Sequence, residues 1–354
     1  MKPTGIVKDA VFLKHDMGPY HPENPRRLEV IYEAIAALNA DLLLTDIPTR
    51  VAQLDEIAAV HTSRHVERIA GTAGIPSTFF DADTSACADT WDAASRAVGG
   101  LLNLLDAVVK GDVRNGFAFV RPPGHHAERG RAMGFCFFNN IALAARYAIA
   151  RLGLDRVAIV DWDLHHGNGT QHAFYDDPAV LFISTHQYPH YPGTGRLRET
   201  GEGPGEGYTV NIPLEAGADD KDYLAAFHMI VAPVVEAFRP DLILVSAGFD
   251  AHRRDPLGGM KLTADGYGQL TEVLMHLAAE FCSGRLVLTL EGGYDPNALQ
   301  ESVVRVLTGL ASYDPERSDV PLRPGLEDLN PRTARVLREV LAVQRQYWPT
   351  VGFF

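Results

Sequence analysis

An α/β fold with a parallel sheet flanked by helices is the class that the sequence predicts. The chain of 354 residues alternates short apolar runs with longer amphipathic stretches, as strands separated by helices do. The apolar runs are short, rich in β-branched residues and largely without polar alternation, as expected of parallel strands buried on both faces. Hydrophobic residues make up 46% of the chain, which is enough to build the core of such a sheet.

Six apolar runs are the candidate strands of this sheet. They span residues 116–120, 157–160, 180–184, 208–212, 242–245 and 286–290. Four of them are followed directly by a polar, glycine-containing segment: RPPGHH, DWDLHHGNG, SAGFDAH and EGGY. In open α/β sheets, ligands bind outside the carboxyl ends of the strands. We therefore expect these four segments to converge on one site.

Four amphipathic stretches predict helices, two before the first of these runs and two between runs. One begins at Asn24 and Pro25, since proline is favoured in the first turn of a helix. The fourth should kink or end at Pro233, which lacks the backbone N–H that a helix requires. The apolar positions that define the four helices are Leu28, Ile31, Ile35 and Leu38; Leu101, Leu102, Leu105 and Val109; Ile141, Ala145 and Ala148; and Leu224, Phe227 and Val231. One more helix is expected near residues 333–344, within a proline-containing tail.

Charge and cysteine content narrow the classes of function. The net charge of −13 disfavours nucleic-acid binding, which needs a dense basic surface. An acidic surface suits a cationic partner such as a lysine-rich tail or an amine, or simply keeps the protein soluble. Cys87, Cys136 and Cys282 are too few and too far apart to imply a disulfide framework, so a reducing cytoplasm fits best. The opening MKPTGIVKDAVFLKHD has no long apolar run, so neither a signal peptide nor a membrane span is expected.

Three polar residues at two strand ends form a candidate metal site. Asp163 and His165 lie two residues apart after one strand, a spacing that points both side chains the same way in extended backbone. Asp250 follows another strand and could supply a third ligand. One imidazole and two carboxylates leave a position open for water, as at catalytic zinc. The same ligand types also suit Fe(II), Co(II) or Mn(II), and any one of these residues alone could merely cap a helix or face solvent.

Two other strand ends carry groups suited to proton transfer and charge stabilisation. His125 and His126 are adjacent in a loop rich in glycine and proline. Beside a metal they become candidates for general acid–base catalysis, because imidazole titrates near neutral pH. Tyr294 follows Gly292 and Gly293, and these glycines allow a sharp turn that brings the phenol toward the site.

These segments together resemble the arginase–deacetylase superfamily on its histone deacetylase branch. The matching motifs are HPENPRRLE, RPPGHHAE, GFCFFNN, VDWDLHHGNGTQ, SAGFDAH and EGGYDPNAL, which span about the first 300 residues. The resemblance is to class II-like bacterial members, which are related to acetylpolyamine amidohydrolases. It implies an open three-layer sandwich with a central eight-stranded parallel sheet. It also implies a single deacetylase domain over residues 1–354, with its core over about 1–310 and a C-terminal tail and helix over 311–354.

The resemblance further implies one catalytic zinc per chain, bound by Asp163, His165 and Asp250, and a set of catalytic roles around it. His126 becomes the proton shuttle and His125 an electrostatic support. Tyr294 becomes the hydrogen-bond donor to the amide oxygen. Asp161 would orient His125, and Asn168 would orient His126. Asn168 replaces the acid of class I members, in agreement with class II enzymes, and this change could alter the basicity of His126.

Residues of the substrate path also follow from the resemblance. Phe135, after Gly134, and Tyr191 become facing walls of a narrow acyl-lysine tunnel, although composition alone would make both aromatics core residues. Asp83 matches a rim acid that accepts backbone N–H groups of a peptide-like substrate. Arg27 matches a buried arginine near the inner end of the tunnel.

Leu257 falls where polyamine-specific members can place an acid, so an apolar residue there argues against a free polyamine substrate. The family often binds structural potassium as well, and the resemblance assigns two sites to it. The inner site would use Asp161, Asp163, His165, Ser184 and Thr185, and the outer site Phe174, Asp177, Val180 and Tyr208.

The function expected from the resemblance is zinc-dependent hydrolysis of N-acetyl-lysine, or of a related acylated amine, with release of acetate. Alternatives are an amidohydrolase for acetylpolyamines or other small N-acyl amines, a non-catalytic acyl-lysine binder, and an arginase-like binuclear manganese hydrolase. The last would need more carboxylates, and Asn168 stands where one would help. The expected partner is an acylated lysine peptide, protein or small amine in the cytoplasm, without nucleic acid or membrane, and a homo-oligomer is compatible with this.

Overall fold

A computed structural model describes residues 2–38, 42–316, 318–349 and 351. Within them, one sheet has eight strands in the order β2-β1-β5-β10-β9-β6-β7-β8, and every neighbouring pair is parallel. The strands are β1 (Thr4–Val7), β2 (Leu44–Asp46), β5 (Asn115–Ala118), β6 (Val157–Asp161), β7 (Val180–Gln187), β8 (Thr209–Leu214), β9 (Leu242–Ala247) and β10 (Leu286–Leu290). A separate antiparallel hairpin pairs β3 (Thr78–Phe79) with β4 (Ser85–Ala86).

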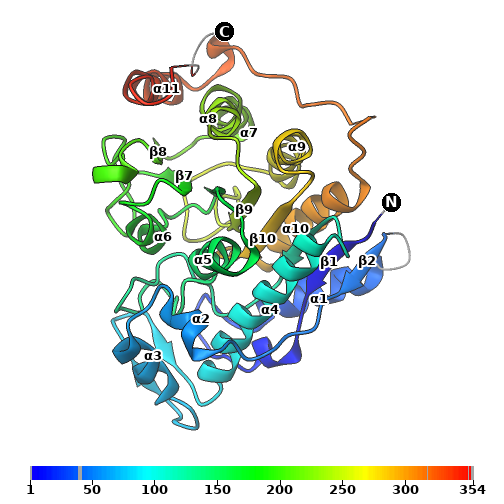
Figure 1. Cartoon of the computed structure of the whole chain (residues 1–354), viewed down its shortest axis with the longest axis vertical. Coiled ribbons are helices and arrows are strands. Elements are labelled where there is room, and N and C mark those ends of the chain that lie inside the picture. Colours follow the sequence, from blue (N-terminus) through cyan, green and yellow to red (C-terminus); the bar gives the residue numbers. More distant parts are fainter. Residues whose placement is uncertain (1, 39–41, 317, 350, 352–354) are drawn as a thin grey trace.

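Helices flank this sheet on both faces. The helices are α1 (Arg26–Leu38), α2 (Leu54–Ala58), α3 (Ser63–Ala70), α4 (Thr90–Lys110), α5 (Asn140–Leu152), α6 (Asn168–Ala173), α7 (Asp220–Ala226), α8 (Ala232–Phe238), α9 (Ala264–Phe281), α10 (Pro296–Ser312) and α11 (Pro331–Gln344), with short turns η1 (Ala10–Leu13), η2 (Gly203–Gly205), η3 (Phe227–Val231) and η4 (Leu326–Asp328). Helices α4 and α5 pack on strands of the sheet and on each other, while α9 and α10 form a second packed pair that α1 and α7 join (Figure 1). The predicted fold class, with a central eight-stranded parallel sheet between helices, is confirmed.

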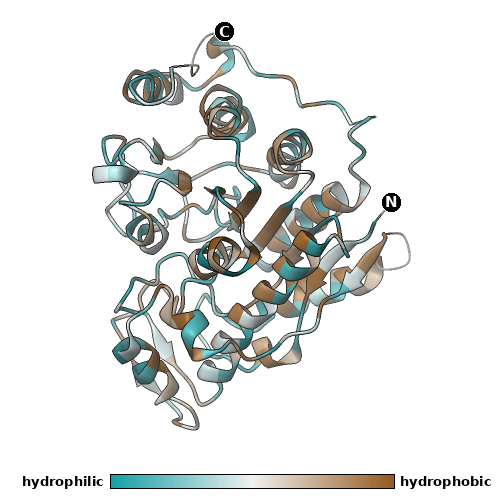
Figure 2. Ribbon diagram, viewed as in Figure 1, coloured by the Kyte–Doolittle hydropathy of each residue, from teal (hydrophilic) through white to brown (hydrophobic). Residues whose placement is uncertain are grey.

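The six predicted runs all become strands, with small shifts at their ends. Strand β10 matches its prediction, and β6, β7 and β9 begin where predicted but extend one to three residues further. The strands β6, β8, β9 and β10 are buried along their whole length, and Figure 2 shows apolar residues concentrated in the middle of the molecule. Burial on both faces explains why their sequences lack polar alternation.

The expected break at Pro233 takes the form of one wide turn. Between α7 and α8 the chain forms the π-helical turn η3, in which the N–H of Ala232 bonds to the carbonyl of Phe227. Pro233 then lies in the first turn of α8, where its missing N–H costs little. The helix pair thus continues in one direction across the proline rather than ending there.

The C-terminal tail covers one edge of the sheet. After α10, the chain runs along the outside of the molecule and returns as α11, which packs against the edge strand β8 (Figure 1). The indole of Trp348 donates a hydrogen bond to the Gly207 carbonyl, just before β8. A covered edge strand has fewer free backbone groups for pairing with another chain. Among the described residues, no helix is both long and apolar enough to cross a membrane.

The sheet order brings the four polar segments together. The strands that precede them, β5, β10, β9 and β6, are consecutive neighbours in the middle of the sheet. Because all four are parallel, their carboxyl ends lie at the same edge. The residues after these strands therefore meet at one place, as the sequence predicts.

Candidate active site and metal centre

Asp163, His165 and Asp250 form a compact buried cluster at this edge of the sheet. Their ligand atoms all lie within 4.8 Å of one another. The His165 Nδ1 atom lies 3.2 Å from Asp163 Oδ1 and 3.0 Å from Asp250 Oδ2. Tetrahedral zinc with bonds of about 2.0–2.2 Å would place its ligands roughly 3.3–3.6 Å apart, so only small movements separate this cluster from a coordination shell.

Backbone groups hold the two carboxylates in place. The Leu164 N–H donates to Asp250 Oδ1 and the His165 N–H donates to Asp163 Oδ1, each at 2.8 Å. The Gly292 N–H donates to Asp163 Oδ2, also at 2.8 Å. A side chain at Gly292 would collide with both carboxylates, which explains the glycine at this point of the EGGY segment.

The charge balance of the cluster fits a bound cation. Burial alone would lower the pKa of His165, but Asp163 and Asp250 outweigh it and raise the pKa to about 10. Burial and the nearby Asp163 raise the pKa of Asp250. Two buried carboxylates around one imidazole nitrogen thus need a positive charge among them, and a divalent metal would take the place of the His165 proton. Among the described residues, this is the one group of three or more such side chains with metal-binding spacing.

The tandem histidines lie against this cluster, and each has its own acceptor. The His125 Nδ1 atom lies 3.0 Å from Asp161 Oδ2, and the His126 Nδ1 atom lies 2.8 Å from Asn168 Oδ1. The His126 ring centroid is 4.0 Å from that of His125 and 5.9 Å from that of His165. The structure therefore places His125 and His126 beside the metal-site residue His165, and each of the two lies next to the acceptor that the sequence assigns to it, Asp161 or Asn168.

The surroundings of the two histidines shift their pKa values in opposite directions. Burial alone would lower the pKa of His125, but Asp163 and Asp161 raise it to about 10. For His126, burial together with His125 and His165 lowers the pKa well below its usual value. These surroundings favour the neutral form of His126 and the protonated form of His125. Adjacent groups with pKa values driven apart are typical of acid–base sites.

Tyr294 lies beside the centre with its phenol free to donate. Its ring contacts Phe135 edge-on, with centroids 5.9 Å apart, and the Arg27 guanidinium lies 5.0 Å from the ring centroid. Arg27 also donates from Nε to the Gly293 carbonyl at 2.6 Å, which holds the loop that turns through Gly293 with φ of 120°. Burial raises the pKa of Tyr294 well above its usual value. In the part of the chain that the structure describes, its hydroxyl has no hydrogen-bond partner.

The segment with Gly134 and Phe135 lies directly over His126. Both residues have left-handed backbone, with φ of 56° and 69°, and a Cβ at Gly134 would collide with the His126 ring. Residues other than glycine rarely adopt this conformation, so the backbone at Phe135 must be held by its contacts. Its backbone N–H donates to Thr84 Oγ1 at 3.0 Å, and its ring packs on His21 with centroids 4.6 Å apart. These contacts fix the aromatic ring between the hairpin and the site.

Tyr191 contacts the same centre from another loop. Its ring lies edge-on to His126 and His165, with centroids 5.1 and 6.1 Å apart. The neighbouring His190 stacks on His165 at 5.2 Å and bonds through Nε2 to the Leu257 carbonyl at 3.1 Å. Tyr191 is partly exposed, with 38% of its surface accessible, so it is not the core aromatic that composition alone would suggest.

Asp83 lies outside this inner group, in the turn between β3 and β4. Its carbonyl accepts from His21 Nε2 at 2.9 Å, and its carboxylate accepts from the hydroxyl of Thr84. Because Thr84 also bonds to Phe135, the turn carrying Asp83 is linked to the wall beside His126. Asp83 is exposed, and its role at the rim stays a prediction.

The residues predicted for potassium fall into two places. Asp161 lies opposite Ser184 across β6 and β7, and the hydroxyl of Thr185 approaches the Asp161 carbonyl at 3.4 Å. The predicted outer set lies at the opposite end of β7, where Phe174 and Asp177 form the turn that leads into the strand and Tyr208 pairs with Phe182.

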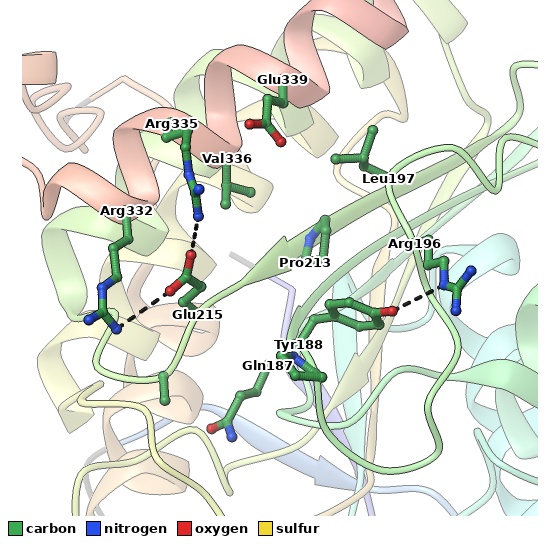
Figure 3. A pocket seen from close by; sticks show the side chains of 12 residues that line it. Gln187, Tyr188, Arg196, Leu197, Pro213, Glu215, Arg332, Arg335, Val336 and Glu339 are labelled. Atoms are coloured by element: carbon green, nitrogen blue, oxygen red, sulfur yellow. Dashed lines mark hydrogen bonds and ion pairs between the residues drawn. The ribbon is translucent and has the colours of Figure 1, made fainter.

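A separate cavity of about 500 Å³ lies between α11 and the loop after β7, the loop that also carries Tyr191. Figure 3 shows Arg332 and Arg335 pointing from α11 toward Glu215, and Arg196 bonded to the Tyr188 hydroxyl. The two ion pairs connect α11 to the loop after β8, and the Arg196–Tyr188 bond lies within the connection from β7 to β8. None of the predicted catalytic or metal-binding residues lines this cavity.

Three buried acids of the site region have roles that the sequence reasoning missed. Glu291 accepts from the Gly124 and His125 backbone N–H groups at 2.7 and 3.1 Å. Asp255 accepts from the Leu257 and Tyr294 N–H groups at 2.9 and 2.6 Å. The third, Glu23, forms ion pairs with Arg27 and Arg121. Glu291, Glu23 and Asp255 lie in or next to the motifs quoted above, but their contacts with Gly124, Arg121 and Tyr294 join residues far apart in the sequence and leave no local pattern.

Comparison with known proteins identifies the family. Residues 21–310 match the model of the histone deacetylase domain, and the chain belongs to the histone deacetylase family. A probable deacetylase of Archaeoglobus fulgidus is 41% identical over 318 residues, which cover 88% of this chain and 87% of that protein. The crystal structure of the HDA15 HD domain matches with a TM-score of 0.91 at 38% identity and covers 99% of this chain and 97% of that one.

Other similar relatives are longer proteins. Histone deacetylase 15 of Arabidopsis thaliana is 40% identical over 94% of this chain, and histone deacetylase HDA1 of Candida albicans is 40% identical over 98% of it. The matched region is only 59% of the first and 45% of the second. The family and these relatives support a deacetylase, which is a hydrolytic enzyme.

Proposed function

We propose that this protein is a zinc-dependent deacetylase that hydrolyses the amide of N-acetyl-lysine in peptides or proteins. The observation that carries the proposal is the buried cluster of Asp163, His165 and Asp250, next to the ring of His126, whose Nδ1 atom bonds to Asn168. A zinc ion there would act as a Lewis acid toward the amide carbonyl and toward a water molecule. We further propose that residues 1–354 act as one catalytic domain and that the two predicted potassium sites are structural.

The protein's own residues then carry out the proton transfers. His126 takes a proton from the attacking water while the water oxygen bonds to the carbonyl carbon. It returns that proton to the lysine nitrogen as the C–N bond breaks, and acetate and the free amine leave. His125, which Asp161 orients through a hydrogen bond, stabilises the negative charge that develops.

Tyr294 supplies the other contribution to the transition state. Its hydroxyl remains protonated, because burial raises its pKa, and it donates to the carbonyl oxygen as that oxygen becomes negative. The Arg27 guanidinium and the hydrogen bond that the Tyr294 N–H donates to Asp255 hold the loop in position. A binder without turnover would not need a donor, a neutral base and a metal cluster in one place.

The walls of the site favour an acyl-lysine over a polyamine. Phe135 and Tyr191 present aromatic rings from two different loops, which suits the uncharged aliphatic stem of acetyl-lysine. The Leu257 carbonyl is hydrogen-bonded to His190. The side chain of Leu257 is apolar, whereas an acid at this position would attract a second amine. The exposed Asp83 in the hairpin turn is suited to accept backbone N–H groups of a peptide.

The substrate class can be tested by comparing three kinds of acylated amine. We expect kcat/KM for an acetyl-lysine peptide to exceed that for N-acetylspermidine by at least about tenfold, since an uncompensated ammonium in an apolar passage is costly. Longer acyl-lysine peptides, measured alongside, report the depth of the pocket. A clear preference for N-acetylspermidine would replace the proposed substrate by a small acylated amine, with the same chemistry.

A further inference from the structure

We propose that Glu128 is a positioning residue that fixes the proton of His126 on Nδ1 through the amide of Asn168. This inference rests on the proposed function, in which His126 acts as the base through Nε2. Glu128 is the last residue of the RPPGHHAE motif, and the mechanism above gives it no role. Its carboxylate oxygen accepts from Asn168 Nδ2 at 2.8 Å.

The surroundings of Asn168 determine which way its amide points. The Nδ2 atom lies near three groups that can only accept: the Glu128 carboxylate, the His126 carbonyl at 3.4 Å and the Met133 sulfur at 3.5 Å. A reversed amide would point its oxygen at all three and lose these bonds. The amide nitrogen therefore faces Glu128, and the amide oxygen faces His126.

The amide direction in turn determines the tautomer of His126. Asn168 Oδ1 lies 2.8 Å from His126 Nδ1 and can only accept. The Nδ1 atom must therefore carry the hydrogen of the neutral ring, which leaves the Nε2 lone pair free to accept a proton from water. Among the three acceptors that hold the amide, Glu128 is the charged one, so it contributes most to this preference.

Glu128 also places a negative charge behind the neutral amide of Asn168. An amide whose N–H donates to a carboxylate is polarised, and its oxygen becomes a stronger acceptor. The pair of Glu128 and Asn168 thus transmits part of a negative charge to His126. Glu128 itself stays ionised, because the hydrogen bond from His172 and that from Asn168 lower its pKa, against the effect of burial.

The first test replaces the charge of Glu128 and keeps its shape. We expect Glu128→Gln to lower kcat about tenfold with little change in KM, because bonds to charged groups are stronger than neutral ones by about the free energy of a tenfold change. Zinc content and melting temperature are measured for each protein. Glu272→Gln, which removes a carboxylate bonded to Arg305 between α9 and α10, controls for the loss of one charge and should keep kcat within about twofold.

A second substitution separates positioning from general support of the loop. In an Asn168→Asp background, the residue at position 168 carries its own charge, and Glu128 becomes a like-charged neighbour. The loss caused by Glu128→Gln should then disappear or reverse, which is a coupling of at least about tenfold in a double-mutant cycle. An equal loss in both backgrounds would mean that Glu128 only supports the loop, and the proposal would be wrong.

The tautomer can be read without any substrate. In zinc-loaded protein with ¹⁵N-labelled histidine, the His126 signals are identified by their loss in His126→Gln. We expect a protonated Nδ1 and an unprotonated Nε2, with a shift toward a mixture in Glu128→Gln. Protonation at Nε2 in the unmodified protein would overturn the proposal. If the protein hydrolyses no acylated amine but shows the expected tautomer, the proposed function fails and the positioning by Glu128 stands.

Discussion

Asp250→Ala is expected to abolish amide hydrolysis and zinc binding while the protein stays folded. The substitution removes one of three ligands from a site whose remaining groups, Asp163 and His165, cannot complete a catalytic zinc shell. Lewis-acid assistance is worth several kcal/mol, so kcat/KM should fall by at least about 10³-fold. Metal analysis and steady-state rates on an acetyl-lysine peptide measure both effects.

Two further variants distinguish metal loss from damage to the fold. In Asp250→Ala the buried Leu164 N–H loses its acceptor, which costs about 1–3 kcal/mol of unfolding free energy. Asp250→Asn keeps an oxygen there and should lose activity with a smaller loss of stability. Asp241→Asn is the matched control, because Asp241 precedes β9 at its other end and accepts from the Asp155 and Arg156 N–H groups. Full zinc content and activity in Asp250→Ala would contradict the proposed centre.

Tyr294→Phe is expected to lower kcat by about 10²–10³-fold with little change in KM, as loss of one oxyanion donor does. The variant loses only a hydroxyl that has no partner among the described residues, so the contacts with Phe135 and Arg27 remain. Stability should therefore hardly change. An interaction made only in the transition state lowers kcat and kcat/KM together.

The control for this substitution is another tyrosine whose hydroxyl makes a bond away from the centre. Tyr147 on α5 donates to Asp106 on α4 at 3.2 Å, and Tyr147→Phe should leave kcat unchanged. Both proteins are compared with the unmodified one at equal zinc content. An unchanged kcat in Tyr294→Phe would remove the donor role and would favour a passive pocket.

The parts of the fold that are readable in the sequence are those whose burial leaves a local pattern. Strands such as β6 and β10 are continuous apolar runs with polar segments behind them, so both the strands and the converging ends could be predicted. The strands β1 and β2 have four and three residues and adjoin or contain charged residues such as Lys8 and Asp46, so they do not stand out as apolar runs. The turn η3 depends on how α7 and α8 pack around Pro233, which composition alone does not indicate.

The candidate site also has a part that could be predicted from the sequence and a part that could not. Asp163, His165 and Asp250 lie two to four residues after the ends of β6 and β9, so sequence position already indicated that they could meet. The contact of Glu128 with Asn168 joins residues 40 positions apart, and that of Asp255 with Tyr294 joins residues 39 apart. Bonds of this kind depend on loop geometry, so only the structure could reveal which acids hold the catalytic groups.

Zinc titration of metal-free protein tests the central claim most directly. The protein is stripped with a chelator, zinc is added in known amounts, and hydrolysis of an acetyl-lysine peptide is measured with bound metal at each step. We expect no activity without metal and a linear rise that ends at one zinc per chain. Undiminished activity in the metal-free protein, or activity that appears only with two manganese ions per chain, would contradict it.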